Sequence, residues 1–337
     1  MKRALLWLLG VLLAGASHAE VDPAAFVRLG GSVLKIEAIR VQGGYSLGSG
    51  VIVGAHKVVT NCHVTRDASE IHVLRNGARF NVQAQASDVD HDLCVLHVPG
   101  IEGGAVRLGH ADALHVGQPV TALGYSGGIG MQNSRGDVVA LHRLDGSHVI
   151  QSTNWFNSGA SGGGLFDDEL RLVGILTFRL RGAGAHYFAA PVEWIESLLA
   201  DGRPLRAIGP FGAQERAFWQ RPIEAQPEFL KAAVLERDRD WPRLEALTTA
   251  WSHVAPADAE PWYLQGLALA QLDRPSAARA ALEHSVQIEP ALAPAWFRLG
   301  VVYLRLGQKD LARTVLARLE SMSADFATQL ARLIEPN

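Results

Sequence analysis

Short apolar runs dominate the chain between residues 30 and 200. They are rich in β-branched and aromatic residues, and Gly, Asn and Asp separate them, so each run predicts a β-strand bounded by turns. The predicted strands cover residues 33–39, 49–53, 57–60, 71–74, 93–98, 120–123, 172–177 and 187–189. Many short strands at near-regular spacing favour a barrel or sandwich over parallel βαβ units.

The pattern becomes helical toward the C-terminus. Pro191 stands where a first helical turn is expected, and apolar residues at 194, 195, 198 and 199 share one face, so a helix is predicted to close the strand-rich half. Pro and Gly between residues 204 and 212 predict a linker over residues 204–224. After residue 225 the sequence is rich in Ala and Leu.

An internal repeat of 34 residues runs through this helical part. The matching pairs are Trp262 and Trp296, Gly266 and Gly300, Ala278 and Ala312, and Leu282 and Leu316, with Pro256 and Pro290 from a weaker earlier copy. A plain helical bundle with accidental spacing is the alternative, and the coincidence of several pairs disfavours it. In period and in residue types, residues 225–335 resemble the tetratricopeptide repeat, which implies an all-α domain that binds protein partners.

The first 19 residues have the pattern of a secretory signal. Lys2 and Arg3 precede an apolar stretch over residues 4–13, and residues 17–19 form a small-x-small cleavage site. A membrane anchor is the alternative, but the stretch is shorter than the ~20 residues that a spanning helix needs. We therefore expect a mature protein that begins near Glu20, lies in the periplasm or is secreted, and has no stable membrane span.

Composition adds a few constraints. A chain of 337 residues is long enough for two domains. The net charge of −3 gives no reason to expect nucleic acid or an anionic membrane as a partner. The two cysteines, Cys62 and Cys94, are a disulfide candidate in an exported protein, although sequence alone does not show that they meet.

Candidate chemistry begins with Ser161, which lies among glycines in residues 158–165. Glycines allow a sharp turn and bring main-chain N–H groups close to a ligand, which suits a serine nucleophile. A flexible Gly/Ser loop is the alternative reading. Two further motifs decide between them: His63 follows a predicted strand, and Asp92 opens another, so the chain order is His, Asp, Ser.

With these three motifs, residues 30–200 resemble a trypsin-like serine protease of the exported Deg/HtrA type. The resemblance implies an all-β double-barrel (chymotrypsin/trypsin-like) domain over residues 20–203. It also implies a catalytic triad, in which Ser161 attacks, His63 takes and returns the proton, and Asp92 orients the imidazole. An esterase with a Gly-x-Ser-x-Gly elbow is rejected because its triad has the order Ser, Asp, His.

Neighbouring residues compete for these roles. Asp88 and Asp90 are alternatives to Asp92, which we prefer because the apolar run begins directly after it. Ser158 is the alternative to Ser161, but no pair of glycines follows it.

By the resemblance, the N–H groups of Gly159 and Ser161 form the oxyanion hole. Ala160 stands where zymogen-activated relatives carry an aspartate, so no ion pair with a newly cut N-terminus is expected. If the triad assembles, Cys62 and Cys94 come close together, which favours a disulfide between them over two buried thiols.

The resemblance also locates a primary specificity pocket. Its floor is expected from Trp155 and Phe156, and its walls from Thr177, Phe178, Arg179 and His186. The absence of an acidic residue at the floor argues against a preference for Lys or Arg. Arg179 and His186 either receive an acidic side chain or point to solvent, and Trp155 could equally make the pocket shallow.

These observations predict an exported serine endopeptidase that acts on protein or peptide substrates and carries a helical tail for a protein partner. No metal or other cofactor is expected. The alternative from another class is a non-catalytic, protease-like scaffold that serves as an interaction module.

Overall fold

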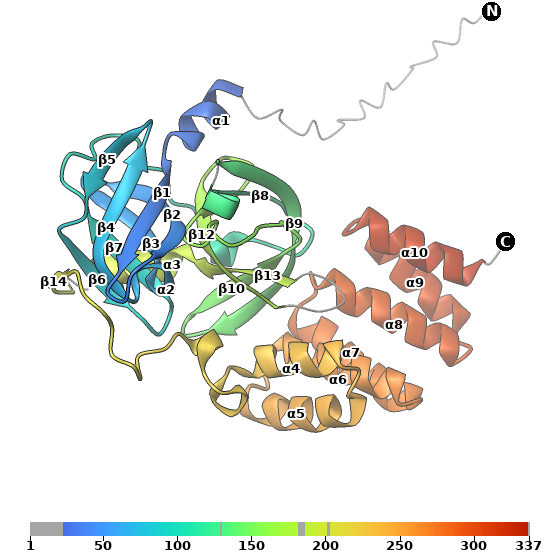
Figure 1. The fold of residues 1–337 in the computed structure, drawn as a ribbon. Coiled ribbons are helices and arrows are strands. Elements are labelled where there is room, and N and C mark those ends of the chain that lie inside the picture. The colour runs from blue at the N-terminus through green and yellow to red at the C-terminus, as the bar shows by residue number, and fades with distance from the viewer. Residues whose placement is uncertain (1–22, 129, 181–185, 201–202, 336–337) are drawn as a thin grey trace, which may run out of the picture.

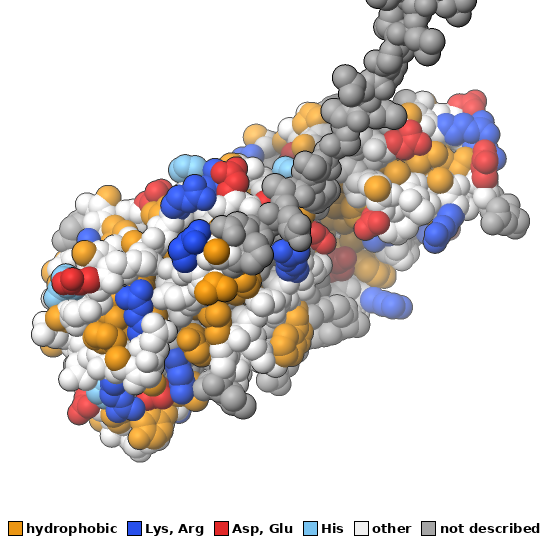
Figure 2. Space-filling view, turned by 90° about the horizontal axis from the view of Figure 1, so that it is seen from above, with side chains coloured by type: hydrophobic (Ala, Val, Ile, Leu, Met, Phe, Trp, Pro, Cys, Tyr) orange, Lys and Arg blue, Asp and Glu red, His pale blue; other side chains and the backbone are white. Residues whose placement is uncertain are grey.

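A computed structural model describes residues 23–128, 130–180, 186–200 and 203–335. The chain forms two β-structures side by side, and the C-terminal helices curve around the outer side of the second (Figure 1). On the face that Figure 2 shows, Lys and Arg alternate with Asp and Glu without a large area of one sign. That distribution matches the small net charge.

The first β-structure is an eight-stranded sheet in the order β14-β6-β7-β3-β2-β1-β4-β5. Its strands are β1 (Val33–Arg40), β2 (Tyr45–Gly54), β3 (Lys57–Asn61), β4 (Ala68–Arg75), β5 (Ala78–Asn81), β6 (Ala84–Asp88), β7 (Leu93–His97) and β14 (Arg206–Ala207). Helix α1 (Pro23–Gly30) precedes the sheet, and the short helix α2 (Cys62–Thr65) follows β3. All pairings are antiparallel.

The second β-structure is a closed barrel in the order β10-β13-β12-β11-β8-β9. Its strands are β8 (Pro119–Gly124), β9 (Gln132–Leu144), β10 (Ser147–Ser152), β11 (Gly164–Phe166), β12 (Leu172–Leu180) and β13 (His186–Pro191). The 3-10 helices η1 (Ala111–Ala113) and η2 (Ser126–Gly128) flank β8, and α3 (Val192–Ala200) closes the domain. Every predicted strand overlaps an observed one, and the predicted all-β fold in two halves is confirmed.

Several strands were not predicted from the sequence: β5, β6, β9, β10, β11 and β14. Strand β9 shows why. Its thirteen residues are mostly exposed or half-buried and include Gly136 and many polar side chains, so no apolar alternation marks it. Its pairing with β8 and β10 forms the strand instead.

The C-terminal part consists of seven α-helices among the described residues. They are α4 (Glu228–Arg237), α5 (Trp241–Val254), α6 (Ala259–Gln271), α7 (Pro275–Ile288), α8 (Ala293–Arg305), α9 (Lys309–Glu320) and α10 (Ala324–Ile334). The repeat recurs in three dimensions: the indole N–H groups of Trp262 and Trp296 donate to the carbonyls of Pro256 and Pro290 at 3.2 and 3.0 Å.

Small residues let these helices pack closely. A methyl group added at Gly266 would overlap the side chain of Leu282, and one added at Gly300 would overlap Leu330. The predicted all-α repeat domain is therefore confirmed, with the glycine of each copy at a helix–helix contact.

The segment 204–224, predicted as a linker, does more than connect the two parts. It contributes β14 to the first sheet, contains the 3-10 helix η3 (Phe218–Gln220) and ends inside a second one, η4 (Ile223–Ala225). Phe218 is 4% exposed, and with Phe229 of α4 it joins the core that also contains Phe188 of the second barrel. The helical part is thus packed against the β-domain through a shared apolar core.

The predicted signal segment, residues 1–19, lies outside the described residues. Among the residues that are described, no helix is both long and apolar enough to cross a membrane.

Candidate active site

His63 and Asp92 form a close pair at the end of the first sheet. The ring Nδ1 of His63 lies 2.6 Å from Asp92 Oδ2, and the main-chain N–H of His63 donates to Oδ1 at 2.8 Å. The Asp92 side chain is only 1% exposed. Both oxygens of this buried carboxylate therefore hold the same histidine, one through its ring and one through its backbone.

Asp92 reaches this position through an unusual backbone conformation. Its φ of +60° is in the left-handed region, which is uncommon for residues other than glycine. The carbonyl of Asp92 accepts hydrogen bonds from the N–H of Cys62 at 3.1 Å and from the side chain of Asn61 at 3.0 Å. These bonds fix the turn before β7 against the turn after β3.

The competing carboxylates have other partners. Asp88 contacts the ring of His91 at 2.8 Å, and Asp90 forms an ion pair with Arg221. The pKa of Asp88 is lowered: burial would raise it, and the hydrogen bond and charge of His91 outweigh burial. Of the three aspartates weighed from the sequence, Asp92 is the one that contacts His63.

A disulfide joins Cys62 and Cys94 in the structure, with their Cα atoms 5.0 Å apart. The register of β3 and β7 explains the proximity, since Thr60 pairs with Cys94 and Asn61 with Leu93. The bridged Cys62 directly precedes His63 in the chain, and Cys94 is two residues after Asp92.

Ser161 lies in a loop that two glycines shape. Gly159 has φ +96° and Gly162 has φ +87°, both in the region that favours glycine. Ser49 of β2 holds this loop from the opposite sheet: its N–H donates to the carbonyl of Ser161 at 2.8 Å, and its hydroxyl donates to the carbonyl of Gly159 at 2.7 Å.

Within the described residues, three main-chain N–H groups of this loop, those of Ser158, Gly159 and Ser161, donate no hydrogen bond. Ala160 lies between the last two, and its N–H donates to the carbonyl of Asn157 at 3.0 Å. Ala160 is 1% exposed. The donors of Gly159 and Ser161 thus lie on either side of a satisfied one.

Hydrogen bonds connect the serine loop to the His63–Asp92 pair. The Ser161 hydroxyl donates to the carbonyl of Thr177 at 3.4 Å, and the Thr177 hydroxyl accepts from Asn61, which also bonds Asp92. Among the described residues no hydrogen bond joins the Ser161 hydroxyl to His63 directly. The link between Ser161 and the His63–Asp92 pair therefore runs through Thr177 and Asn61, across the junction of the two β-structures.

The residues expected around the specificity pocket differ in their surroundings. Trp155 is 52% exposed, so its ring is not a buried floor, whereas Phe156 is 5% exposed and packs on Tyr187 with ring centroids 5.0 Å apart. Arg179 donates to the Asn157 side chain at 3.0 Å. The side chain of His186 lies outside those that the structure describes.

Thr177 and Phe178 point in different directions from β12. Thr177 is 2% exposed, and its hydroxyl donates to the carbonyl of Ile175 at 2.7 Å. Phe178 stacks on Phe188, with centroids 4.6 Å apart, inside the core. Phe178 is thus a core residue, and its place in a pocket wall stays a prediction.

Sequence reasoning missed one residue at this site, Trp219 of η3. Its indole N–H donates to Asp92 Oδ2 at 3.1 Å, and its ring meets that of His63 edge-on at 5.6 Å. Trp219 lies in the segment that the sequence analysis predicted as a linker, and no motif distinguishes a tryptophan at that position.

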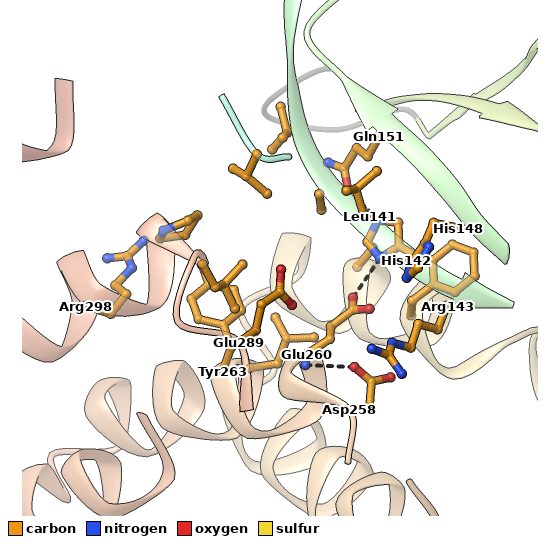
Figure 3. Close-up of a pocket in the computed structure, with 18 of the residues that line it drawn as sticks. Leu141, His142, Arg143, His148, Gln151, Asp258, Glu260, Tyr263, Glu289 and Arg298 are labelled. Atoms are coloured by element: carbon orange, nitrogen blue, oxygen red, sulfur yellow. Dashed lines mark hydrogen bonds and ion pairs between the residues drawn. The ribbon is translucent and has the colours of Figure 1, made fainter. Parts of the chain in front are cut away.

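A separate cavity of about 490 Å³ lies between the second barrel and the helices. Strands β9 and β10 form one wall, and α4, α6, α8 and α10 form the other (Figure 3). His142 of β9 bridges the two walls: its Nδ1 lies 2.7 Å from Glu260 Oε1, and its ring stacks on Phe229.

Acidic side chains gather in this cavity. Glu236, Asp258 and Glu289 line it together with Glu260 (Figure 3 labels the last three), and burial raises the pKa of each of the first three. Burial would lower the pKa of His142, but the Glu260 carboxylate raises it overall. Arg143, His148 and Arg298 line the same cavity, so it holds groups of both signs.

Family comparisons agree with this architecture. Residues 48–175 match the trypsin-like peptidase domain, and residues 269–334 match the tetratricopeptide repeat. The chain is therefore similar to trypsin-like peptidases over residues 48–175 and to tetratricopeptide repeats over residues 269–334.

Among curated proteins, the periplasmic serine endoprotease DegP of Salmonella typhimurium is 36% identical over 165 residues, which cover 45% of this chain and 35% of that protein. The serine endoprotease DegS of Haemophilus influenzae is 31% identical over 186 residues, which cover 50% of this chain and 54% of that protein. The chain thus spans 35% and 54% of the length of these relatives.

Solved structures share the fold. The active form of the Rv3671c protease from M. tuberculosis is similar with a TM-score of 0.50 and 22% identity, over 58% of this chain and 91% of that chain. At this identity the likeness supports the fold alone.

Proposed function

We propose that this protein is a serine endopeptidase with Ser161 as nucleophile, His63 as general base and Asp92 as the orienting acid. The observation that carries the proposal is that, among the described residues, the N–H groups of Gly159 and Ser161 donate no hydrogen bond, in a loop that Thr177 and Asn61 link to Asp92. Two free donors around one serine are what the oxyanion of an acyl-transfer intermediate needs.

The chemistry follows from these contacts. Asp92 accepts from His63 Nδ1, which leaves Nε2 as the base and fixes the tautomer. The Ser161 hydroxyl turns from the Thr177 carbonyl toward Nε2 when substrate binds, and catalytic hydrogen bonds often tighten only then. Nε2 takes the proton as Oγ attacks the carbonyl carbon, and later gives it to the leaving amine.

No zymogen cleavage is needed in this scheme. Ala160 is buried and has no carboxylate to pair with a new N-terminus, and Ser49 already holds the loop. A requirement for a further N-terminal cut before Ser161 becomes reactive would contradict this part of the proposal.

Export is part of the proposal. The basic start and apolar stretch at the N-terminus, the disulfide, and relatives named as periplasmic proteases all support a periplasmic or secreted protein. Release of residues 1–19 during export, measured by mass spectrometry of the mature protein, tests it.

Active-site labelling with a fluorophosphonate tests the nucleophile. The wild type should be labelled at one residue and Ser161→Ala should not, while Ser158→Ala, a serine three positions earlier in the same loop, should be labelled like the wild type. A folded wild type that is not labelled would favour the alternative, a protease-like scaffold without catalysis.

We further propose that the cavity in Figure 3 receives a protein segment with basic side chains. The lining supports this, because the carboxylates outnumber the arginines there: Asp112, Glu236, Asp258, Glu260 and Glu289 stand against Arg143 and Arg298. Asp258 is buried, Glu236 is half-buried and Glu289 is exposed at the cavity, and a nearby cation stabilises the charged form of a carboxylate. A fluorescein-labelled oligolysine peptide should bind more tightly than an oligoglutamate peptide, and Glu289→Gln should weaken it relative to the exposed control Glu224→Gln. Equal affinity for both peptides would contradict the proposal.

A further inference from the structure

Trp219 completes the hydrogen-bonding of Asp92 from outside the β-domain. It lies in η3, on the segment that leads to the repeat helices. Its N–H reaches Oδ2 at 3.1 Å, the same oxygen that the His63 ring contacts at 2.6 Å. Since the backbone of His63 donates to Oδ1, three donors together hold this buried carboxylate.

The indole ring is itself fixed between aromatic neighbours. It stacks on Phe178 with centroids 5.0 Å apart and planes inclined by 11°. Its edge contact with His63 has centroids 5.6 Å apart and an angle of 88°. One side chain thus contacts both members of the His63–Asp92 pair and the strand that carries Thr177.

The segment around Trp219 is anchored on both sides. The N–H of Phe218 donates to the carbonyl of Asp90 at 2.9 Å, and Arg221 pairs with the Asp90 carboxylate. The side chain of Gln226 donates to the carbonyls of Trp219 and Arg221 at 3.2 and 2.8 Å. The anchor residue, Asp90, belongs to the turn that presents Asp92.

Among the described residues, Asp92 Oδ2 has two hydrogen-bond partners, the His63 ring inside the β-domain and the Trp219 indole outside it. Thr177, the nearest hydroxyl on β12, donates to the carbonyl of Ile175 instead. A carboxylate in a buried site keeps its orientation only if its oxygens are hydrogen-bonded. Loss of the indole N–H would leave Oδ2 bound to His63 alone.

We infer that Trp219 is a positioning residue for the His63–Asp92 pair, supplied by the segment that joins the protease to its repeats. This inference rests on the proposed peptidase function. It implies that the active site is complete only when residues 217–221 lie against the first sheet, so the repeats and the catalytic pair share one structural element.

The test compares full-length variants by the rate of fluorophosphonate labelling. Trp219→Phe keeps an aromatic ring on Phe178 but removes the N–H. We expect its maximal labelling rate to fall about tenfold, which corresponds to ~1.4 kcal/mol, while the reagent concentration at half-maximal rate and the final stoichiometry stay unchanged. A purely structural role would lower the stoichiometry instead.

Trp262→Phe is the matched control, because it also removes an indole N–H that donates to a backbone carbonyl, and we expect the wild-type rate. If Trp219→Phe does not fold, Arg221→Ala replaces it: this change loosens the anchor at a half-exposed ion pair and should slow labelling about threefold.

The outcomes separate the two proposals. An unlabelled wild type overturns the peptidase function itself. A labelled wild type whose rate is unchanged in Trp219→Phe, or in Arg221→Ala where that variant is used, overturns the role of Trp219 and leaves the peptidase function intact.

Discussion

The hydroxyl of Ser49 donates a hydrogen bond of 2.7 Å to the carbonyl of Gly159, and it accepts one of 2.8 Å from the N–H of Tyr125. Ser49 belongs to the first sheet, whereas Gly159 and Tyr125 belong to the second β-structure. A single buried side chain therefore fixes the Ser161 loop across the junction.

Ser49→Ala should destabilise the protein by about 1–3 kcal/mol, because it leaves a buried carbonyl and an N–H without a partner. It should also slow labelling of Ser161, since the loop loses its anchor. Urea unfolding and the labelling rate measure the two effects. Ser69→Ala removes an exposed hydroxyl bonded to the Ile39 carbonyl and should change neither, so equal effects in both variants would contradict the anchoring role.

Gly162 cannot carry a side chain without movement of the backbone. A methyl group there would overlap the carbonyl oxygen of Ser49 and the hydroxyl of Thr60. Gly162→Ala should therefore lower the free energy of unfolding by at least twice as much as a substitution that adds backbone strain without a clash. It should also abolish labelling of Ser161. Gly43→Ala is the control: Gly43 has φ +86° but open space around it, so strain of about 1–2 kcal/mol is expected. Thermal unfolding distinguishes the two, and equal losses would argue against the steric explanation.

The disulfide should contribute strongly to stability. It links residues 32 positions apart, and closing a loop of this size constrains the unfolded chain by about 3–4 kcal/mol in the chain-entropy picture. The double variant Cys62→Ser/Cys94→Ser should lose that amount in urea unfolding. Reductant should destabilise the wild type but not the variant. Free thiols in the exported protein, detected by mass spectrometry without reductant, would contradict the bond.

His142 predicts a pH-dependent contact between the second barrel and α6. Its pKa is raised, because the Glu260 carboxylate and the Gln151 side chain outweigh burial. Because the pKa of His142 is higher in the folded than in the unfolded state, its protonation stabilises the folded protein. This stabilisation is complete at a pH below the unfolded-state pKa of about 6.5. It is lost as the pH rises through the folded-state pKa.

The measurement is urea unfolding of the wild type and His142→Gln. The variant should be less stable by about 1.5–3 kcal/mol at pH 6, the range for a hydrogen bond to a charged group, and the difference should shrink at higher pH. His253→Gln removes an exposed histidine that only donates to the Thr249 carbonyl, and should show no such trend. A constant difference for His142→Gln would refute the prediction.

Much of the fold was predictable because its signals are local. The glycines around Ser161, the strand before His63 and the apolar run after Asp92 are each short patterns with a direct conformational meaning. The 34-residue period likewise reflects a repeated helix pair, and α6 and α8 begin at Ala259 and Ala293, one period apart.

Other features were not predictable because they depend on residues distant in the chain. The apolar run after Asp92 singled it out among three nearby aspartates, but no local pattern showed that Asn61 and Cys62 would hold its turn by hydrogen bonds to its carbonyl. Strand β9 has a polar sequence, so its pairing partners form it. The sequence placed Phe178 in the wall of a specificity pocket, and in the structure Phe178 stacks on Phe188 in the core.

By itself the sequence determined the order of the candidate catalytic residues, the two-part architecture and the repeat, since these follow from neighbours in the chain and from fixed spacing. Only the tertiary structure decided that the segment 204–224 contacts the His63–Asp92 pair, where the sequence predicted a linker. The physical reason is that the indole of Trp219 has a polar edge and an apolar face, and one fold satisfies both: Asp92 accepts from the edge, and Phe178 covers the face.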